Sequence, residues 1–358
     1  METRKSSLED LEKVEMNMNG FKFSICLPTY NMGALIASTI ENILAQDFQN
    51  FELIVSDNCS PDKTEDVVKG FSDPRIRYFR NEINLGYFGN LNRCMELATG
   101  DVIFLMSAKS FLSKDALSRA HKAFCLCDDV GAVTRPYYWF GKDVMTPVRA
   151  KARYSKDRDL VVSIDSDLKD IIAVFHTLDN PAGLAFRREF MDVGFHKDAF
   201  VEFTYPFASI LKKHKVVLLK DYTMACPALE YSGSQNPAVY EKSPIQCWVD
   251  LFSTIFKDEE GSKCSFVRKR CIEDFVATNY IGLVQIRNYA RRYVYLLREI
   301  ALLVKYRPEN LINPQFWFFS LGTMLMPRSI LRRLAQEYKK KINAKILKNL
   351  PGKVALNI

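Results

Sequence analysis

Two buried-strand patterns, each ending in a polar loop and separated by one helical segment, constrain the fold of this chain most. The first begins at Phe23 and leads into Pro28, Thr29, Tyr30 and Asn31. The second begins at Phe51 and leads into Asp57 and Asn58. In an open α/β sheet, ligands bind beyond the carboxyl ends of the strands. The sequence therefore predicts that both loops face one crevice.

Strand and helix patterns alternate through residue 126. Strands are predicted at 22–27, 51–56, 75–79 and 101–106. Helices are predicted at 33–45, at 60–68, from the turn at 84–86 to residue 98, and at 115–126. Ser60 is the expected N-cap of the second helix. Repeated strand–helix units predict an α/β fold with a mostly parallel sheet, helices on both faces and right-handed crossovers.

The pattern loosens beyond residue 133. Residues 135–161 are rich in Tyr, Arg and Lys and predict a mobile loop near the site. Regular structure returns at 167–175, 183–186, 204–213 and 215–219, and the sequence after Pro244 is helical to its end. We therefore expect three parts: a polar leader at 1–20, an α/β domain at 21–240 whose halves meet at residue 133, and a helical region at 241–358.

Charge is unevenly distributed in this chain, whose formal net charge is +8. From Arg328 to Lys348 there are eight Lys or Arg residues and one acid, Glu337, which indicates a negatively charged partner such as a membrane surface. No apolar run approaches the roughly 20 residues of a spanning helix, and the charged N-terminus is not a secretory signal. Nine cysteines without paired spacing favour reduced thiols and a cytoplasmic location.

Four ordered blocks within residues 22–126 resemble family 2 glycosyltransferases of the bacterial surface-polysaccharide type. The blocks are 24–31, 54–60, 80–86 and 96–101, and residues 181–188 with 193–195 resemble the acceptor-side segment of the same family. The resemblance implies a GT-A fold, which is the Rossmann-like fold of nucleotide-diphospho-sugar transferases. It also implies transfer of a sugar from a nucleoside diphosphate donor to a glycan hydroxyl, with inversion, in synthesis of a surface polysaccharide such as lipopolysaccharide.

The resemblance places the nucleotide beside the first two polar loops. Asp57 is expected to contact the base, because an ionised carboxylate is a short acceptor suited to base N–H groups. A loop cap that accepts from neighbouring N–H groups is the alternative for Asp57. Pro28 and Thr29 would shape the loop around base and ribose, with Tyr30 and Asn58 beside them. Asn31 would either contact the ligand or cap the helix that begins near Met32, and we favour the cap.

The turn after the third strand is expected to form a wall of the donor pocket. Its residues are Asn84, Leu85 and Gly86, and the turn signal is weak when it stands alone. Arg80 and Asn90 would either reach a phosphate or sugar hydroxyl or lie on a solvated surface.

The chain departs from the family pattern after the fourth strand, where the family holds Mg²⁺ or Mn²⁺ on paired aspartates. Hard cations prefer carboxylate and phosphate oxygens, but this chain has Ser107, Ala108, Lys109 and Ser110, with Lys109 and Ser110 at the aspartate positions. We assign no metal ligand. Three explanations stay open: a metal-independent enzyme in which Lys109 faces the diphosphate, an inactive binding or scaffold protein, or introduced substitutions.

An inverting transfer needs a general base that takes the acceptor proton. Glu202 is the first candidate because it lies just before a predicted helix, whose dipole would hold it ionised. Asp198 is the second candidate and His196 the third. A plain acid at the helix N-terminus is the alternative for Glu202.

The C-terminal third combines aromatic and basic residues. Aromatic and apolar side chains cluster between Phe316 and Met326, directly before the basic segment 328–348. This combination predicts an interfacial anchor on an anionic membrane surface, and the alternative is a core cluster followed by a solvated helix. With the resemblance, it implies a lipid-linked acceptor at the inner face of the cytoplasmic membrane. Nucleic-acid binding is not expected, because interleaved stacking aromatics are missing.

Overall fold

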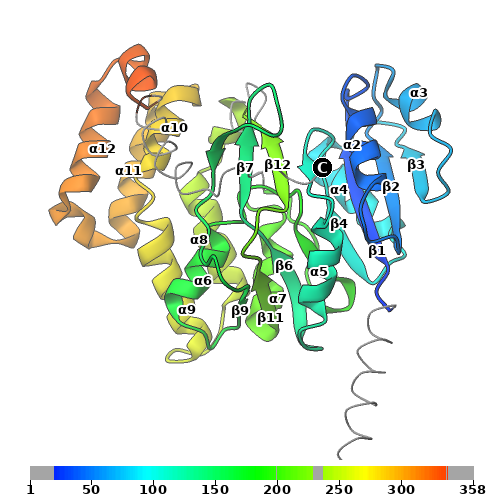
Figure 1. Cartoon of the computed structure of the whole chain (residues 1–358). Coiled ribbons are helices and arrows are strands. Elements are labelled where there is room, and N and C mark those ends of the chain that lie inside the picture. Colours follow the sequence, from blue (N-terminus) through cyan, green and yellow to red (C-terminus); the bar gives the residue numbers. More distant parts are fainter. Residues whose placement is uncertain (1–19, 199, 229–236, 336, 338–358) are drawn as a thin grey trace, which may run out of the picture.

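The computed structural model describes residues 20–198, 200–228, 237–335 and 337. Its centre is an eight-stranded sheet in the order β3-β2-β1-β4-β10-β6-β11-β9 (Figure 1). The strands are β1 (Phe23–Thr29), β2 (Phe51–Asp57), β3 (Ile76–Arg80), β4 (Val102–Leu105), β6 (Val130–Thr134), β9 (Leu160–Val162), β10 (Ala185–Arg187) and β11 (Lys215–Leu218). β1 to β4 pair in parallel, as do β6 and β11, whereas β10 and β9 are antiparallel to their neighbours. The predicted mostly parallel sheet is confirmed.

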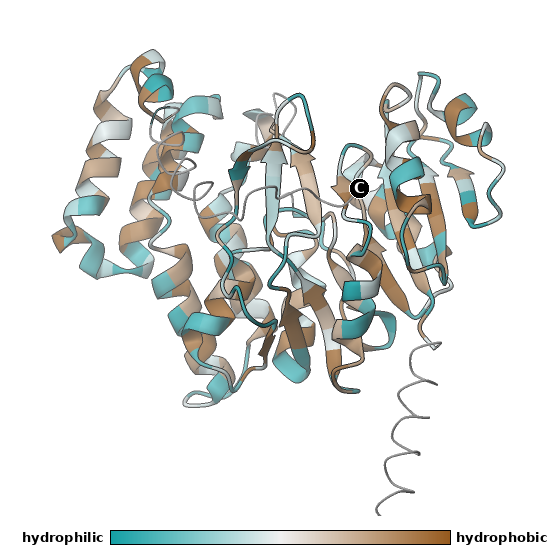
Figure 2. Ribbon diagram, in the orientation of Figure 1, coloured by the Kyte–Doolittle hydropathy of each residue, from teal (hydrophilic) through white to brown (hydrophobic). Residues whose placement is uncertain are grey.

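Helices cover both faces of this sheet because its strands are apolar on both sides, as parallel strands usually are. One face packs against α2 (Ile36–Leu44), α3 (Thr64–Lys69) and α5 (Ala116–Phe124). The other face packs against α4 (Gly86–Leu97), α6 (Leu168–Phe175) and α7 (Thr204–Lys213). Figure 2 shows the hydrophobic colouring gathered on the strands between these layers.

A second, four-stranded sheet lies beside the first, in the order β5-β12-β7-β8. Its strands are β5 (Phe111–Leu112), β12 (Met224–Pro227), β7 (Tyr137–Phe140) and β8 (Pro147–Ala150). The prediction of a loop at 135–161 was therefore wrong, since the segment contains β7, β8 and β9. The run Tyr137-Tyr138-Trp139-Phe140 has the aromatic composition typical of strands, and this signal was outweighed by the charged residues that follow it.

The described part of the C-terminal region is helical, as predicted. It contains α8 (Pro244–Ile255), α9 (Lys263–Cys271), α10 (Ile281–Tyr289), α11 (Tyr293–Tyr306), α12 (Pro314–Leu325) and a last helix at 328–335. Short turns of other helix types lie at η1 (Arg188–Phe190), η3 (Pro237–Glu241), η4 (Ile272–Val276) and η5 (Pro308–Ile312). Buried residues of α8 to α12 belong to the same apolar cluster as one face of the large sheet. The leader at 1–19 and the basic residues at 339–348 lie outside the described residues.

Two expected helix starts differ from the structure. α2 begins at Ile36 rather than near Gly33, and Leu35 precedes it with no side-chain cap. α3 begins at Thr64, so Ser60 is not its N-cap. Within the described residues, no helix has the length and apolar character needed to cross a bilayer. All nine cysteines are free thiols.

Candidate active site at the carboxyl edge of the sheet

Four parallel strands bring their carboxyl ends to one edge of the large sheet. β1 is parallel to β2 and β4, and β6 points the same way because β10 is antiparallel to both β4 and β6. The segments that follow these strands begin at Tyr30, Asn58, Met106 and Arg135. The fold therefore brings together the two polar loops that were predicted to face one crevice.

Asp57 ends β2 and is fully buried. Its Oδ1 accepts from the Ser60 backbone N–H at 2.9 Å, and its Oδ2 accepts from the Tyr78 hydroxyl at 2.7 Å and from Arg80 Nη1 at 3.1 Å. Arg80 also donates to the Ser60 carbonyl at 2.9 Å. The carboxylate is thus occupied by protein donors, in the arrangement of a loop cap and ion pair, and its contact with a base stays a prediction.

Four asparagines join the loop after β2 to the turn before α4. Asn58 Nδ2 donates to Asn84 Oδ1 at 2.8 Å and to the Gly86 carbonyl at 3.1 Å, while its Oδ1 accepts from the Leu85 backbone N–H at 2.8 Å. Asn81 donates to both Asn58 and Asn90. Asn90 is buried and bonded to the hydroxyl and carbonyl of Ser56. This asparagine network holds the turn that was predicted to form the pocket wall. Asn90 is buried within the network and does not lie on a solvated surface.

The loop after β1 is tied to the loop after β2 through its backbone. The Thr29 carbonyl accepts from the Asn58 backbone N–H at 2.9 Å, and Pro28 lies opposite Ser56 in the sheet. Asn31 has φ of 56° and donates its backbone N–H to Ser60 Oγ at 2.9 Å. It therefore does not cap a helix, contrary to our preferred interpretation. Tyr30 is exposed beside it.

The loop after β4 is short and carries no carboxylate. Ser107 and Ser110 close a turn through a backbone hydrogen bond of 3.0 Å, and Ala108 and Ser110 are buried. Lys109 is half-buried, and burial lowers the pKa of its ammonium group, an effect that the nearby Cys226 thiol opposes. Burial likewise raises the pKa of Cys226, in β12, to about 12.

This loop does not fit a divalent cation. Between Val102 and Lys114 the chain contains no Asp or Glu, so no register of the family pattern places a carboxylate after β4. Within the described residues, no group of three or more His, Cys, Asp or Glu side chains could hold a metal ion. A cationic side chain, Lys109, stands where the family pattern has acids.

Sequence analysis did not single out Arg135, which directly follows β6 on the same edge. It is fully buried and donates from its guanidinium to the carbonyls of Thr177, Asn180 and Ala182. Burial lowers its pKa to about 10. Gly183 has φ of +83°, and a Cβ there would lie 2.7 Å from Arg135 Nε. Arg135 thus holds the segment before β10 in place, and its position directly after a buried strand was the signal that could have revealed it.

Glu202 lies two residues before α7, as expected, but the helix dipole does not dominate its ionisation. Burial, reinforced by the Asp198 carboxylate, raises the pKa of Glu202 to about 7. Glu202 also acts electrostatically on Tyr87, in the first turn of α4. The turn at 84–86 that begins α4 is held by Asn58, so the candidate base and the pocket wall meet at the start of this helix.

The two weaker candidate bases lie beside Glu202 but are engaged differently. Asp198 is buried, and its carboxylate accepts a hydrogen bond from the Cys247 thiol. The pKa of this thiol is raised first by its own burial and then by the hydrogen bond to Asp198. The His196 ring stacks on Tyr205 with centroids 4.2 Å apart, and its Nδ1 is buried without a hydrogen-bond partner among the described residues. Burial raises the pKa of Glu202 to about 7, which keeps it the first candidate base.

Residues 24–177 match the family described as glycosyl transferase family 2. Through this segment, the chain is similar to glycosyl transferase family 2. The matched residues contain the loops after β1, β2, β4 and β6 and end before Glu202, so the similarity covers the loops that are predicted to hold the nucleotide.

Curated relatives match over less than a third of this chain. One is the GalNAc(5)-diNAcBac-PP-undecaprenol beta-1,3-glucosyltransferase of Campylobacter jejuni, 37% identical over 27% of this chain and 32% of the relative. Another is the UDP-Glc:alpha-D-GlcNAc-diphosphoundecaprenol beta-1,3-glucosyltransferase WfgD of Escherichia coli, 35% identical over 29% and 39%. A third is the abequosyltransferase RfbV of Salmonella typhimurium, 34% identical over 26% and 30%. The alignments span about a third of the length of these relatives.

Solved structures resemble most of this chain. TarS 1-349 of S. aureus in complex with UDP-GlcNAc superposes with a TM-score of 0.61 over 88% of this chain and 92% of that one, at 16% identity. The mannosyltransferase PcManGT of Pyrobaculum calidifontis in complex with GDP-Man and Mn²⁺ gives 0.51 over 85% and 86%, at 18% identity. At these identities the likeness concerns the fold, and the predicted GT-A fold is confirmed.

Proposed function

We propose that this chain transfers a sugar from a nucleoside diphosphate donor to a hydroxyl of a glycan acceptor during synthesis of a cell-surface polysaccharide. One observation carries the proposal. The half-buried Glu202, with its pKa raised to about 7, acts electrostatically on Tyr87 at the start of α4, where the loop from β2 anchors the pocket wall. A base near neutrality beside a nucleotide-side loop suits direct displacement by an acceptor hydroxyl.

The acceptor we propose is a lipid-linked glycan. Two of the relatives are named for acceptors linked through a diphosphate to undecaprenol. The substrate lipid would place the reaction at the inner face of the cytoplasmic membrane, with the chain as a peripheral protein. Transfer would invert the anomeric centre, because the acceptor hydroxyl would displace the diphosphate in one step and a single displacement inverts configuration. One general base is enough for that step.

Lys109 would face the donor diphosphate in place of a metal. Its loop leaves the same edge of the sheet as Asp57, and a positioned cation can stabilise charge that develops on the leaving group. The ammonium would contact the diphosphate oxygens as they become free of the sugar. The Asp57 loop would hold the base and ribose while Glu202 takes the acceptor proton.

An inactive binding or scaffold protein is the competing proposal. Two observations favour it: the carboxylate-free loop after β4, and the Asp57 carboxylate, whose two oxygens already accept three hydrogen bonds from protein groups. Nucleotide binding without turnover would fit this protein, and the two experiments below separate the possibilities.

The first experiment titrates UDP, GDP and CDP into the full chain by calorimetry, with Mn²⁺ or with EDTA. We expect one diphosphate to bind equally well in both, and Lys109→Met to weaken it about 10- to 100-fold because a charge-assisted contact is lost. Lys114→Met, which removes an exposed lysine five residues downstream of Lys109 and just beyond β5, is the control. Binding that requires Mn²⁺ would contradict the role of Lys109, and no binding of any nucleotide would favour a scaffold.

The second experiment follows sugar transfer as a function of pH. Glu202→Gln should lower kcat about 10²- to 10⁴-fold and leave donor affinity unchanged. A base acts when deprotonated, so the parent rate should rise as the pH passes upward through about 7, and this rise should be missing in the variant. Glu189→Gln, which removes an exposed glutamate of η1, should behave like the parent. An unchanged rate in Glu202→Gln would exclude Glu202 as the base.

A further inference from the structure

α12, an outer helix of the molecule (Figure 1), is apolar on its exposed side as well as on the side that packs against the core. Its buried residues are Phe316, Ser320 and Thr323. Its exposed residues include Trp317, Phe318, Leu321 and Leu325, and the side chains of Phe318 and Leu325 are 74% and 80% exposed. A surface helix normally turns its apolar stripe toward the core. The sequence of α12 therefore fits a helix that has an apolar neighbour on its outer side.

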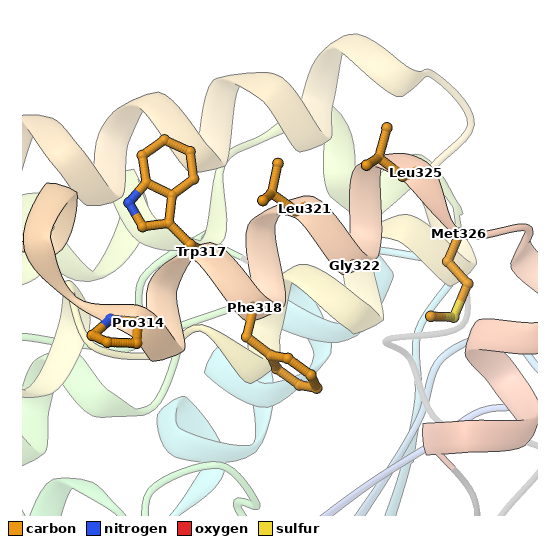
Figure 3. A pocket seen from close by; sticks show the side chains of 7 residues that line it. All are labelled: Pro314, Trp317, Phe318, Leu321, Gly322, Leu325 and Met326. Atoms are coloured by element: carbon orange, nitrogen blue, oxygen red, sulfur yellow. The ribbon is translucent and has the colours of Figure 1, made fainter.

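The exposed side chains form one continuous surface, which we call the α12 face. Figure 3 shows Trp317, Leu321 and Leu325 projecting from one side of the helix and Phe318 from another. With Pro314 and Met326 they line a shallow hollow, whose floor is open because a Cβ on Gly322 would meet no atom within 4 Å. Trp317 donates its indole N–H to the Leu311 carbonyl at 2.8 Å, so its ring is left for apolar contact.

The flank of the α12 face is cationic. No Asp or Glu occurs between Glu309 and Glu337, whereas Arg328, Arg332 and Arg333 follow the helix directly. Arg328 and Arg332 are exposed and donate to the carbonyls of Ala290 and Asn288, at 3.1 and 2.9 Å. These carbonyls lie at the C-terminal end of α10, a helix that packs against α12. The arginines are thus anchored beside the α12 face.

We propose that the α12 face inserts into the headgroup boundary of an anionic bilayer, with the flanking arginines on the phosphates. Tryptophan and phenylalanine favour this boundary, and a helix that lies in its plane needs an apolar face beside basic residues. α12 has 12 residues, too few to span a bilayer. This inference rests on the proposed function in one respect, which is that a lipid-linked acceptor would bring the chain to a membrane. It adds the surface of the protein that would contact the bilayer.

The test measures binding of the full chain to sedimented vesicles of phosphatidylcholine, with and without phosphatidylglycerol. We expect binding that needs phosphatidylglycerol and weakens with added salt, because clustered arginines act through the surface potential. Phe318→Ser with Leu325→Ser should weaken binding about tenfold or more. The control is Leu126→Ser with Phe266→Ser, which removes side chains that are 56% and 50% exposed in the turn after α5 and in α9 and should bind like the parent.

Three outcomes would overturn the proposal. The first is a parent chain that does not bind the anionic vesicles, and the second is equal binding by the Phe318/Leu325 variant. The third is a parent dimer in sedimentation velocity that the same variant dissolves, since a second copy would then cover the face. Transfer to a lipid-free acceptor glycan, measured on the same samples, should be unchanged in the variant, so that failure here is distinguishable from failure of the proposed transferase activity.

Discussion

Two loops leave the same edge of the large sheet and are built in opposite ways. The loop after β2 is closed on itself, since Asp57 accepts three protein hydrogen bonds and the asparagine network ties the loop to the turn before α4. The loop after β4 has no carboxylate and presents a half-buried lysine whose ammonium is disfavoured by burial. We therefore expect the first loop to stabilise the fold and the charge of Lys109 in the second loop to oppose it, as for a group retained for binding.

The largest expected effect is on the loop after β2. Asp57→Asn removes a fully buried charge that pairs with Arg80 and should lower the free energy of unfolding by about 3 kcal/mol, measured from urea midpoints. Asp73→Asn removes a carboxylate from a partly exposed ion pair with Arg75 and should cost less than about 1 kcal/mol. If both variants lost the same free energy of unfolding, the buried hydrogen bonds of Asp57 would not be what stabilises this loop.

Lys109→Met should have the opposite sign. Burial lowers the pKa of this lysine in the folded chain, so its charge opposes folding at neutral pH, and its removal should raise the free energy of unfolding by about 1–2 kcal/mol. The gain should shrink as the pH rises from the lowered pKa toward the ordinary value of 10.5, because the folded parent then loses the charge. A loss of stability at pH 7 would remove the contrast between the two loops.

The smallest expected effect concerns the turn that Asn58 holds. Gly86 has φ of +72° and open space where a Cβ would lie, so Gly86→Ala should cost about 1 kcal/mol through backbone strain alone. Gly322→Ala in α12 has equally open space and no positive φ, and should stabilise by up to about 1 kcal/mol through helix propensity. Thermal unfolding of the pair checks this, and destabilisation of both would point to packing instead of strain.

The sequence predicted the strands that follow a strict pattern and missed those that do not. The first four strands were placed within two residues because each is an apolar run followed by polar residues. β7 and β8 were missed although they pair with each other as a local antiparallel hairpin. β7 also pairs with β12, which lies far away in the chain, with Met224 opposite Tyr137. Such pairings leave no local period to detect.

The candidate site was predictable in its position and less so in its chemistry. Asp57, Asn58 and Asn84 were expected near one another because strand ends share an edge, and they are. Their mutual hydrogen bonds could not be predicted, because the sequence does not distinguish an asparagine that bonds to a neighbouring residue from one that bonds to a ligand. The raised pKa of Glu202 depends on burial and on the Asp198 carboxylate, and only tertiary packing supplies the burial.

The place of β10 in the large sheet has a consequence for how the chain folds during synthesis. Ala185 pairs with Phe104 on one side and Val133 on the other, so β4 and β6 are joined only by a strand that the ribosome makes some 50 residues after β6. Until then, one edge of β4 and both edges of β6 are unpaired, because β11 is made later still, and unpaired edges are templates for mispairing. We infer that the first half of the chain depends on the slow, long-range pairing of β10 with β4 and β6. We therefore expect that aggregation during expression, more than low native stability, limits the yield of any fragment that ends before residue 187.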